Sequence, residues 1–318
     1  MSKFSFSRLK STKDTGFGDN FSGRFINKDG YPNIKKKGIN ILNRYSWYHT
    51  MLDLKRWQFI GLLVGSYIIV NFMFALIYYL IGIEHLTGID KSNFANEFTD
   101  VFFFSSQTFT TVAYGRIPPV EFLASLVPTF DAFLGLLAFA IATGLFYGRF
   151  SRPRAFLKFS DVALISPYKQ KSALMFRMAP FKNTSLTDAS ITVLASFEMT
   201  ENGETKSSFY TLKLEVTKIT SLILNWTIVH YIDEDSPFYS LTAEDIKNID
   251  IEIIVHVKAF DSIFSSDVVQ RTSYTSDEII YGAKFEKMYG PDETNRFTIL
   301  NLDLINSNFP AGLPDISS

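Results

Sequence analysis

Few side chains in this sequence have the types and spacing that catalysis or metal binding requires. The chain contains no cysteine, which excludes disulfides, iron–sulfur clusters and thiolate zinc sites. Its four histidines are scattered, and no two of them have the spacing of metal ligands. No serine–histidine–aspartate set, phosphate-binding loop or carboxylate pair stands out. The formal net charge of -1 gives no support for a nucleic-acid partner. We therefore do not expect an enzyme.

A threonine-rich run offers a different chemistry, the coordination of a cation by oxygen atoms. The residues Thr111-Val112-Ala113-Tyr114-Gly115 resemble Thr-Val-Gly-Tyr-Gly, the run that lines the selectivity filter of potassium channels. In that filter, four copies direct backbone carbonyls and a threonine hydroxyl toward the ion and replace its hydration shell. Ala113 stands where the pattern has glycine.

The exchange of glycine for Ala113 has a physical cost. Glycine serves such a filter because alternate residues adopt left-handed backbone angles. An L-residue forced into that conformation costs about 1–2 kcal/mol, or about 4–8 kcal/mol in a symmetric tetramer. Two outcomes stay open: ion binding and packing absorb the strain, or the carbonyl turns away and one ion-binding site is lost.

Two apolar segments flank this run and are long enough to position it in a membrane. Phe59 to Ile83 contains no charged residue, and Phe122 to Tyr147 is apolar except for Asp131. About 20 apolar residues suffice to cross a bilayer. The sequence therefore predicts two spans within a pore domain at 58–150.

The flanking charges predict the orientation of the two spans. Basic residues precede the first span and follow the second, whereas the connector between them is of mixed charge. The positive-inside rule then places both termini in the cytoplasm. The residues before the first span are Lys35, Lys36, Lys37, Arg44, Lys55 and Arg56, and those after the second are Arg149, Arg152, Arg154 and Lys158.

The connector between the spans carries a segment too short to cross. Phe98 to Phe109 is predicted to form a re-entrant helix that leads into the threonine-rich run, and Pro118-Pro119 ends it outside. Irregular backbone at membrane depth is tolerated only where it lines a water-filled path or is buried in protein.

The N-terminal part has two predicted sections. Residues 1–43 are read as a flexible cytoplasmic tail. Residues 44–57 have apolar and aromatic residues at helical spacing, which favours an amphipathic helix at the cytoplasmic interface. The alternative is the frayed start of the first spanning helix.

Residues 151–318 are predicted to be a cytoplasmic, immunoglobulin-like β-sandwich. Ile191, Val193, Ala195 and Phe197 alternate with polar residues, and so do Ile251, Ile253, Val255 and Val257. Asn202-Gly203 is a hairpin turn signal between two such runs.

Two spans, a re-entrant filter and a sandwich together resemble the inward-rectifier potassium channel family, especially its bacterial branch. The resemblance runs from about Arg44 to about Tyr289. Its motifs include Trp47-Tyr48-His49, Arg149-Phe150-Ser151-Arg152-Pro153, and the run from Trp226 to Phe238.

The resemblance implies a homotetramer in the inner cell membrane with voltage-independent gating and one central path for K⁺. Thr111, Val112, Ala113 and Tyr114 would supply the carbonyl rings, and Gly115 ends the filter. Asp131 would face the pore below the filter and attract cations.

Further positions acquire expected roles from the same resemblance. Phe139 stands where strongly rectifying members carry an acid, so polyamine block there is expected to be weak. Gly144 matches a hinge, or else a helix-packing contact. Tyr147 matches a hydrophobic gate, or else an interfacial belt tyrosine. Asp188 matches an acidic position of the cytoplasmic vestibule, or else is a solvated carboxylate.

The basic cluster after the second span is expected to bind anionic lipid, at about 1 kcal/mol per residue. The cluster comprises Arg149, Arg152, Arg154 and Lys158. Topology alone would also place basic residues there, but the family uses this region for regulation by anionic lipids.

Three departures from the family surround the filter: Ala113, Gln107 in place of a pore-helix glutamate, and Arg116 in place of an aspartate after the final glycine. The leading hypothesis is a lipid-gated K⁺ channel. The alternatives are a cation channel of reduced K⁺ selectivity and a non-conducting membrane sensor with a vestigial pore. A membrane enzyme is a remote alternative, because the sequence has no catalytic constellation.

Overall fold

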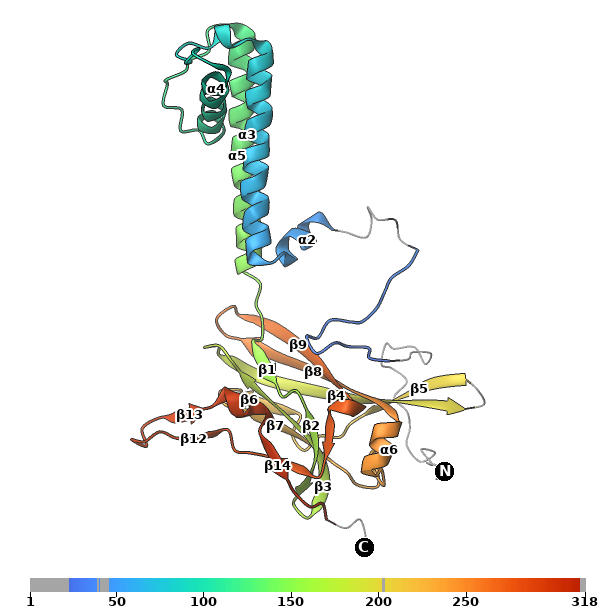
Figure 1. The fold of residues 1–318 in the computed structure, drawn as a ribbon. Helices are drawn as coiled ribbons and strands as arrows, with labels where there is room; N and C mark the ends of the chain where they lie inside the picture. Colours follow the sequence, from blue (N-terminus) through green and yellow to red (C-terminus); the bar gives the residue numbers. More distant parts are fainter. Residues whose placement is uncertain (1–22, 39, 41–45, 202–203, 315–318) are drawn as a thin grey trace. The chain divides into compact units, whose positions relative to one another are not determined.

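The computed structural model describes residues 23–38, 40, 46–201 and 204–314, and the chain divides into two compact units. One unit, residues 37–152, is helical. The other combines the described part of residues 1–36 with residues from 153 onward and is built from β-strands (Figure 1).

The described part of the helical unit contains two long helices and two short ones. They are α2 (Trp47–Asp53), α3 (Arg56–Ile81), α4 (Phe94–Phe109) and α5 (Phe122–Phe150). Within the described residues, α3 and α5 are long and apolar enough to cross a membrane. This confirms the prediction of two spans.

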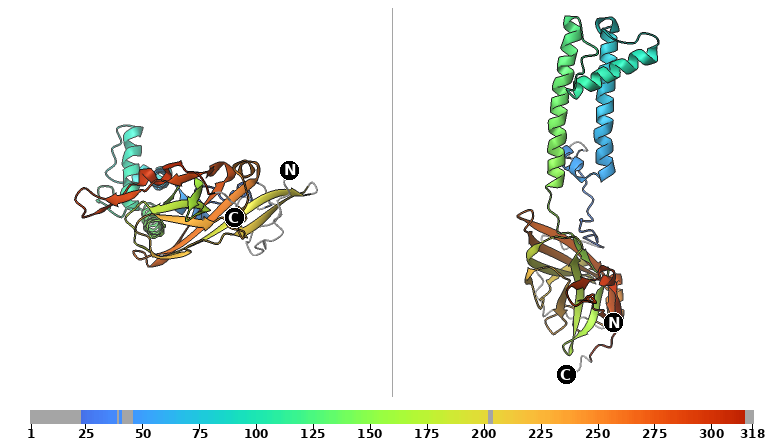
Figure 2. Two further views of the ribbon diagram at one scale, coloured as in Figure 1. Left: turned by 90° about the horizontal axis from the view of Figure 1, so that it is seen from below. Right: turned by 90° about the vertical axis from the view of Figure 1, so that its left-hand side faces the viewer.

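Helix α4 is the short helix predicted between the spans. The side chain of Asn93 accepts a hydrogen bond from the Asn96 backbone N–H at 2.9 Å and caps its first turn. Its apolar residues pack with those of α3 in a cluster that includes Phe74, Tyr78 and Val101. Figure 2 shows α4 lying obliquely against the two long helices at one end of the unit.

The β-unit is a sandwich of two five-stranded sheets. One sheet has the order β1-β3-β2-β10, with β7 paired to β3; the other has the order β5-β4-β8-β9, with β6 paired to β4. Their bounds are β1 (Leu157–Phe159), β2 (Ala163–Tyr168), β3 (Lys171–Pro180), β4 (Leu186–Glu201), β5 (Glu204–Thr211), β6 (Lys218–Ser221), β7 (Trp226–Tyr231), β8 (Asp250–Asp261), β9 (Ser266–Thr275) and β10 (Ile279–Tyr281).

Smaller elements complete the unit. Two further strand pairs form, β11 with β14 and β12 with β13. These elements are β11 (Ala283–Phe285), β12 (Tyr289–Pro291), β13 (Thr298–Leu300), β14 (Asn308–Pro310), the helix α6 (Ala243–Asn248) and the 3₁₀ turns η2 (Ile83–His85, in the helical unit), η3 (Ser276–Glu278) and η4 (Leu302–Asn306).

The predicted alternation in the central strands is confirmed. Ile191 of β4 lies opposite Val257 of β8, and Val193 lies opposite Val255; all four side chains are buried between the sheets. The turn predicted at Asn202-Gly203 lies outside the described residues, although β4 and β5 on either side of it pair antiparallel.

One segment differs from the expectation of a flexible tail. Residues 24–33, here called the N-terminal strap, lie against β8 and β9. Arg24 donates to the Ser273 carbonyl at 2.7 Å and forms an ion pair with Glu278 at 3.1 Å. Ile26 is buried. The tail prediction is therefore wrong for the strap, because these contacts, made 249 and 254 residues away along the chain, order it.

The strap also explains an exception in β8. The alternating pattern puts Glu252 on the face away from the core, yet only 4% of it is exposed. Its carboxylate accepts hydrogen bonds from the backbone N–H groups of Phe25 and Ile26 at 2.7 and 2.9 Å. Burial is the dominant cause of a raised pKa for Glu252, and these hydrogen bonds oppose it.

Candidate ion-conduction site

The end of α4 leads directly into the candidate filter segment, residues 110–115. The Thr110 backbone N–H and hydroxyl both donate to the Ser106 carbonyl, at 3.1 and 2.8 Å. The backbone N–H groups of Val112 and Ala113 both donate to the Gln107 carbonyl, at 2.9 and 3.2 Å. The helix terminus therefore fixes the first half of the segment.

The backbone of the segment alternates in hand. Thr111, Ala113 and Gly115 have φ angles of 59°, 41° and 74°, whereas Val112 and Tyr114 are not in the left-handed region. Such alternation turns successive peptide units in a regular way, which is the geometry that a ring of stacked carbonyls needs. Ala113 thus keeps the left-handed conformation that glycine would adopt, and it carries the strain of about 1–2 kcal/mol.

Gly135 on α5 is a site residue that the sequence reasoning missed. A Cβ at this position would lie 1.8 Å from the carbonyl oxygen of Phe109, the last residue of α4. Only glycine permits so close an approach of two backbones. The only signal in the sequence is that residue 135 is a glycine. The need for a glycine comes from the close approach of α4, which the sequence does not show.

Asp131 does not face an open pore, and this expectation is wrong. It is 0% exposed within a single chain, and its Oδ2 accepts a hydrogen bond from the Tyr78 hydroxyl of α3 at 3.1 Å. A side chain that α3 and α4 already enclose cannot line a cavity shared by four copies.

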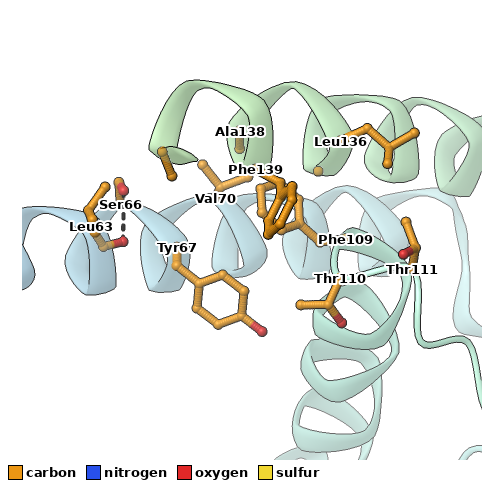
Figure 3. Close-up of a pocket in the computed structure, with 12 residues that line it drawn as sticks. Leu63, Ser66, Tyr67, Val70, Phe109, Thr110, Thr111, Leu136, Ala138 and Phe139 are labelled. Atoms are coloured by element: carbon orange, nitrogen blue, oxygen red, sulfur yellow. Dashed lines mark hydrogen bonds between the residues drawn. The ribbon is translucent and has the colours of Figure 1, made fainter. Parts of the chain in front are cut away.

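A cavity of about 740 Å³ lies beside the end of α4, between α3 and α5 (Figure 3). Its lining is mostly apolar, with hydroxyls from Ser66, Tyr67, Thr110 and Thr111. Phe139 of α5 and Phe109 of α4 also line it, and both are labelled in Figure 3. The cavity therefore places hydroxyl oxygens of the filter segment next to an apolar space.

Phe139, Gly144 and Tyr147 lie along the exposed part of α5. Phe139 and Tyr147 are 74% and 75% exposed in the single chain, and a Cβ added to Gly144 would meet no other described part of the chain within 4 Å. Large exposed apolar side chains on a spanning helix face lipid or another copy of the chain. Their expected roles as cavity and gate residues stay predictions.

Arg116, at the end of the filter segment, is tied back to α4. Its guanidinium forms an ion pair with Asp100 at 3.2 Å, and the same carboxylate oxygen accepts the Asp90 backbone N–H at 3.0 Å. Hydrogen bonds from Ser92 are the main cause of a lowered pKa for Asp90, and Arg116 adds to it. The end of the segment next to Arg116 is therefore held by a charged cluster.

Two of the four expected lipid-binding residues have partners on α2 or at its C-cap, Leu54. Arg149 donates to the carbonyl oxygens of Leu52 and Leu54 at 3.4 and 2.6 Å. Arg152 forms an ion pair with Asp53 at 2.7 Å. These contacts couple the end of α5 to α2, a direct link that the sequence did not predict.

The remaining expected site residues belong to the β-unit. Arg154 is exposed, and Lys158 donates to the Leu302 carbonyl at 3.4 Å. Asp188 lies at a bulge in β4 with a φ of 49°, and its exposed carboxylate pairs with Lys218 at 3.1 Å. That lysine offsets the negative charge expected of a cation-concentrating vestibule.

Two membrane-crossing helices, a short helix between them and an oxygen-bearing loop of alternating hand define the class of pore-loop ion channels. Residues 66–152 match the family described as "Ion channel", and residues 157–314 match "Inward rectifier potassium channel C-terminal domain".

Individual relatives agree with these matches. The chain is 34% identical over 271 residues to "Inward rectifier potassium channel Kirbac3.1" of Paramagnetospirillum magnetotacticum, across 84% of this chain and 89% of that protein. It is 29% identical over 291 residues to "ATP-sensitive inward rectifier potassium channel 15" of Mus musculus and of Homo sapiens, across 82% of this chain and 76% of each relative. The chain belongs to the inward rectifier potassium channel family. It is a membrane protein that acts as an ion channel and not as an enzyme.

Proposed function

We propose that four copies of this chain form a homotetrameric channel that conducts K⁺ across the inner cell membrane, with both termini in the cytoplasm and with gating by anionic lipid. Residues 111–115 of each copy form the selectivity filter. The alternating hand of Thr111, Ala113 and Gly115 is the observation that carries this proposal.

The filter assignment is supported by the way in which the segment is held. The carbonyl of Gln107 accepts hydrogen bonds from the backbone N–H groups of Val112 and Ala113. Both donors are therefore satisfied within the chain. Tyr114 is 78% exposed in the single chain, and a neighbouring copy would cover it in the tetramer. One copy cannot surround an ion, so the filter requires the assembly.

Gating by lipid is supported by the accessibility of the link between α2 and α5. The side chains of Arg152 and Asp53 are 35% and 60% exposed, and an ion pair of this kind contributes about 0–1 kcal/mol. A lipid phosphate can therefore compete for Arg152. Exposed Trp47 and Tyr48 on α2 suit the headgroup region.

The test is cation flux into liposomes, compared for the wild type and Ala113→Gly. Each purified tetramer is reconstituted, and K⁺-driven and Na⁺-driven uptake are measured in parallel. We expect selective K⁺ flux in the wild type. The glycine variant should increase K⁺ selectivity or conductance, because it removes about 1–2 kcal/mol of strain per chain.

The outcomes separate the competing functions. Equal Na⁺ and K⁺ flux in the wild type would support a channel of reduced selectivity, with Ala113 as its cause if glycine restores the ratio. If both proteins are tetrameric and neither conducts, the channel proposal fails and a non-conducting sensor replaces it. Gly65→Ala is the control, because a Cβ added there would meet no other described part of the chain within 4 Å.

A further inference from the structure

Helix α3 carries three polar side chains on one face within apolar surroundings. Tyr67, Asn71 and Tyr78 are spaced so that they lie on the same side of a helix. Asn71 and Tyr78 are buried within the single chain. Polar residues inside a membrane span are costly and are retained with partners, so their contacts reveal what this face does.

The first two residues hold α4. The Tyr67 hydroxyl is hydrogen-bonded to the Ser106 hydroxyl, and the Ser105 hydroxyl donates to Asn71 Oδ1 at 3.0 Å. Asn71 in turn donates from Nδ2 to the Tyr67 carbonyl at 2.8 Å. Helix α3 thus holds Ser105 and Ser106 of α4. The backbone carbonyls of Ser106 and of the next residue, Gln107, accept the hydrogen bonds that hold the filter segment.

The third residue connects this face to α5. The Tyr78 hydroxyl donates to Asp131 Oδ2 at 3.1 Å, and the Asp131 carboxyl lies close to the Ser105 hydroxyl. Asp131 Oδ1 is buried and has no hydrogen-bond partner among the described residues. Because an isolated carboxylate is very costly to bury in apolar surroundings, a hydrogen-bonding role suits this position better than an electrostatic one.

We infer that Asp131, together with Tyr78, is a positioning residue for the selectivity filter. The bond between Asp131 and Tyr78 joins α5 to α3 close to Ser105 of α4, and so it keeps the end of α4 in place. A shift of Ser105 and its neighbours is transmitted to Val112 and Ala113 through their shared acceptor, the Gln107 carbonyl. The inference rests on the proposed function, because it takes residues 111–115 as the filter.

The experiment compares Asp131→Asn, Asp131→Leu and Tyr78→Phe in the full-length tetramer. The ratio of K⁺ to Na⁺ flux is measured in liposomes, with tetramer assembly checked by gel filtration. Asparagine keeps an oxygen that accepts the Tyr78 hydroxyl, so its ratio should stay near that of the wild type. Asp131→Leu and Tyr78→Phe should each lower the ratio about tenfold, because each leaves a buried polar group without its hydrogen-bond partner.

The double variant Tyr78→Phe/Asp131→Leu supplies a second criterion. If the two residues act through one contact, the double variant should lose no more selectivity than either single variant. Thr129→Ala is the matched control on α5, because its exposed hydroxyl donates to the Ser125 carbonyl of its own helix and to no other described residue. The control should behave as the wild type.

A charge that attracts cations would give a different pattern. Asp131→Asn and Asp131→Leu would then reduce K⁺ flux equally while the ratio stayed constant, and that result would overturn the inference. Unchanged ratios in both Asp131→Leu and Tyr78→Phe would overturn it as well. If Asp131→Leu does not assemble, Tyr78→Phe decides the matter, because it removes a single hydroxyl group.

Failure of the proposed function remains distinguishable from failure of the inference. A wild type without K⁺ flux would refute both. A wild type that conducts selectively, alongside variants that do the same, would refute the positioning role of Asp131 and leave the channel intact.

Discussion

At the scale of single residues, this chain meets the demands of its filter segment in two opposite ways. Ala113 adopts a left-handed backbone despite having a Cβ, whereas Gly135 uses the absence of a Cβ to let α5 approach the carbonyl of Phe109. The first residue costs conformational free energy, and the second avoids a collision. Both act on the backbone and not through side-chain chemistry.

Gly135→Ala is expected to disrupt the site without touching the filter segment itself. The new methyl group would lie 1.8 Å from the Phe109 oxygen, so α5 or α4 must move. We expect a loss of about 1–3 kcal/mol in stability, as is usual for overpacking, together with reduced K⁺ selectivity.

The measurement combines thermal unfolding of the detergent-solubilised tetramer with liposome flux. Gly65→Ala on α3 serves as the matched control, since it has open space and gains helix propensity. Equal unfolding temperatures and flux ratios for the two variants would show that the close approach at Gly135 has no consequence.

At the scale of elements, α2 is attached to the end of α5 by contacts of unequal strength. Arg149 bonds two backbone carbonyls while its guanidinium lies over the Phe59 ring at 4.9 Å, and Leu52 packs with Phe59 and Leu145. By contrast, Arg152 has one exposed carboxylate partner, Asp53. The first contact is suited to anchoring and the second to exchange with lipid.

Opposite substitutions in the exposed pair should shift lipid dependence in opposite directions. Asp53→Asn frees Arg152, so channel activity should reach half its maximum at a lower fraction of anionic lipid. Arg152→Gln should require a higher fraction. Each shift should be about fivefold, since one basic residue contributes about 1 kcal/mol at the membrane surface.

Flux is measured in liposomes in which the fraction of anionic lipid is varied at constant ionic strength. Lys247→Gln, which removes an exposed charge from α6, should leave the titration unchanged. Shifts of the same sign for Asp53→Asn and Arg152→Gln would instead indicate that the pair only stabilises α2.

At the scale of the whole molecule, the β-unit is completed by a segment from the other end of the chain. The strap places Ile26 and the backbone of Phe25 over β8, where Glu252 accepts two N–H groups. Lys28 adds an ion pair to Glu278 at 3.1 Å, and burial is the main cause of its lowered pKa. The sandwich therefore depends on residues that precede both spans.

Arg24→Gln should loosen the strap and destabilise the β-unit. It removes a half-buried ion pair with Glu278 and a charged hydrogen bond to the Ser273 carbonyl. Hydrogen bonds to charged groups contribute about 1.5–3 kcal/mol, so the unfolding temperature should fall by several degrees. Cleavage after Phe25 by chymotrypsin should become faster.

Both readouts use the full chain in detergent. Lys35→Gln is the control, because Lys35 is exposed and lies just beyond the strap. An unchanged unfolding temperature and cleavage rate in Arg24→Gln would mean that the strap contributes nothing to the stability of the sandwich.

The sequence by itself determined the features that depend on local pattern. Two apolar runs of sufficient length, a short helix before a threonine-rich loop, and alternating residues such as Ile191 and Val193 are visible because helical and extended chains bury their side chains at fixed periods. The family followed from motifs of the same local kind.

Only the tertiary structure decided where the polar groups of Asp131, Arg152 and Glu252 are satisfied. Their partners lie 53 residues away at Tyr78, 99 at Asp53, and 226 and 227 at Ile26 and Phe25. A buried polar group must find a hydrogen bond wherever the fold supplies one, and no local pattern specifies a partner at such a distance.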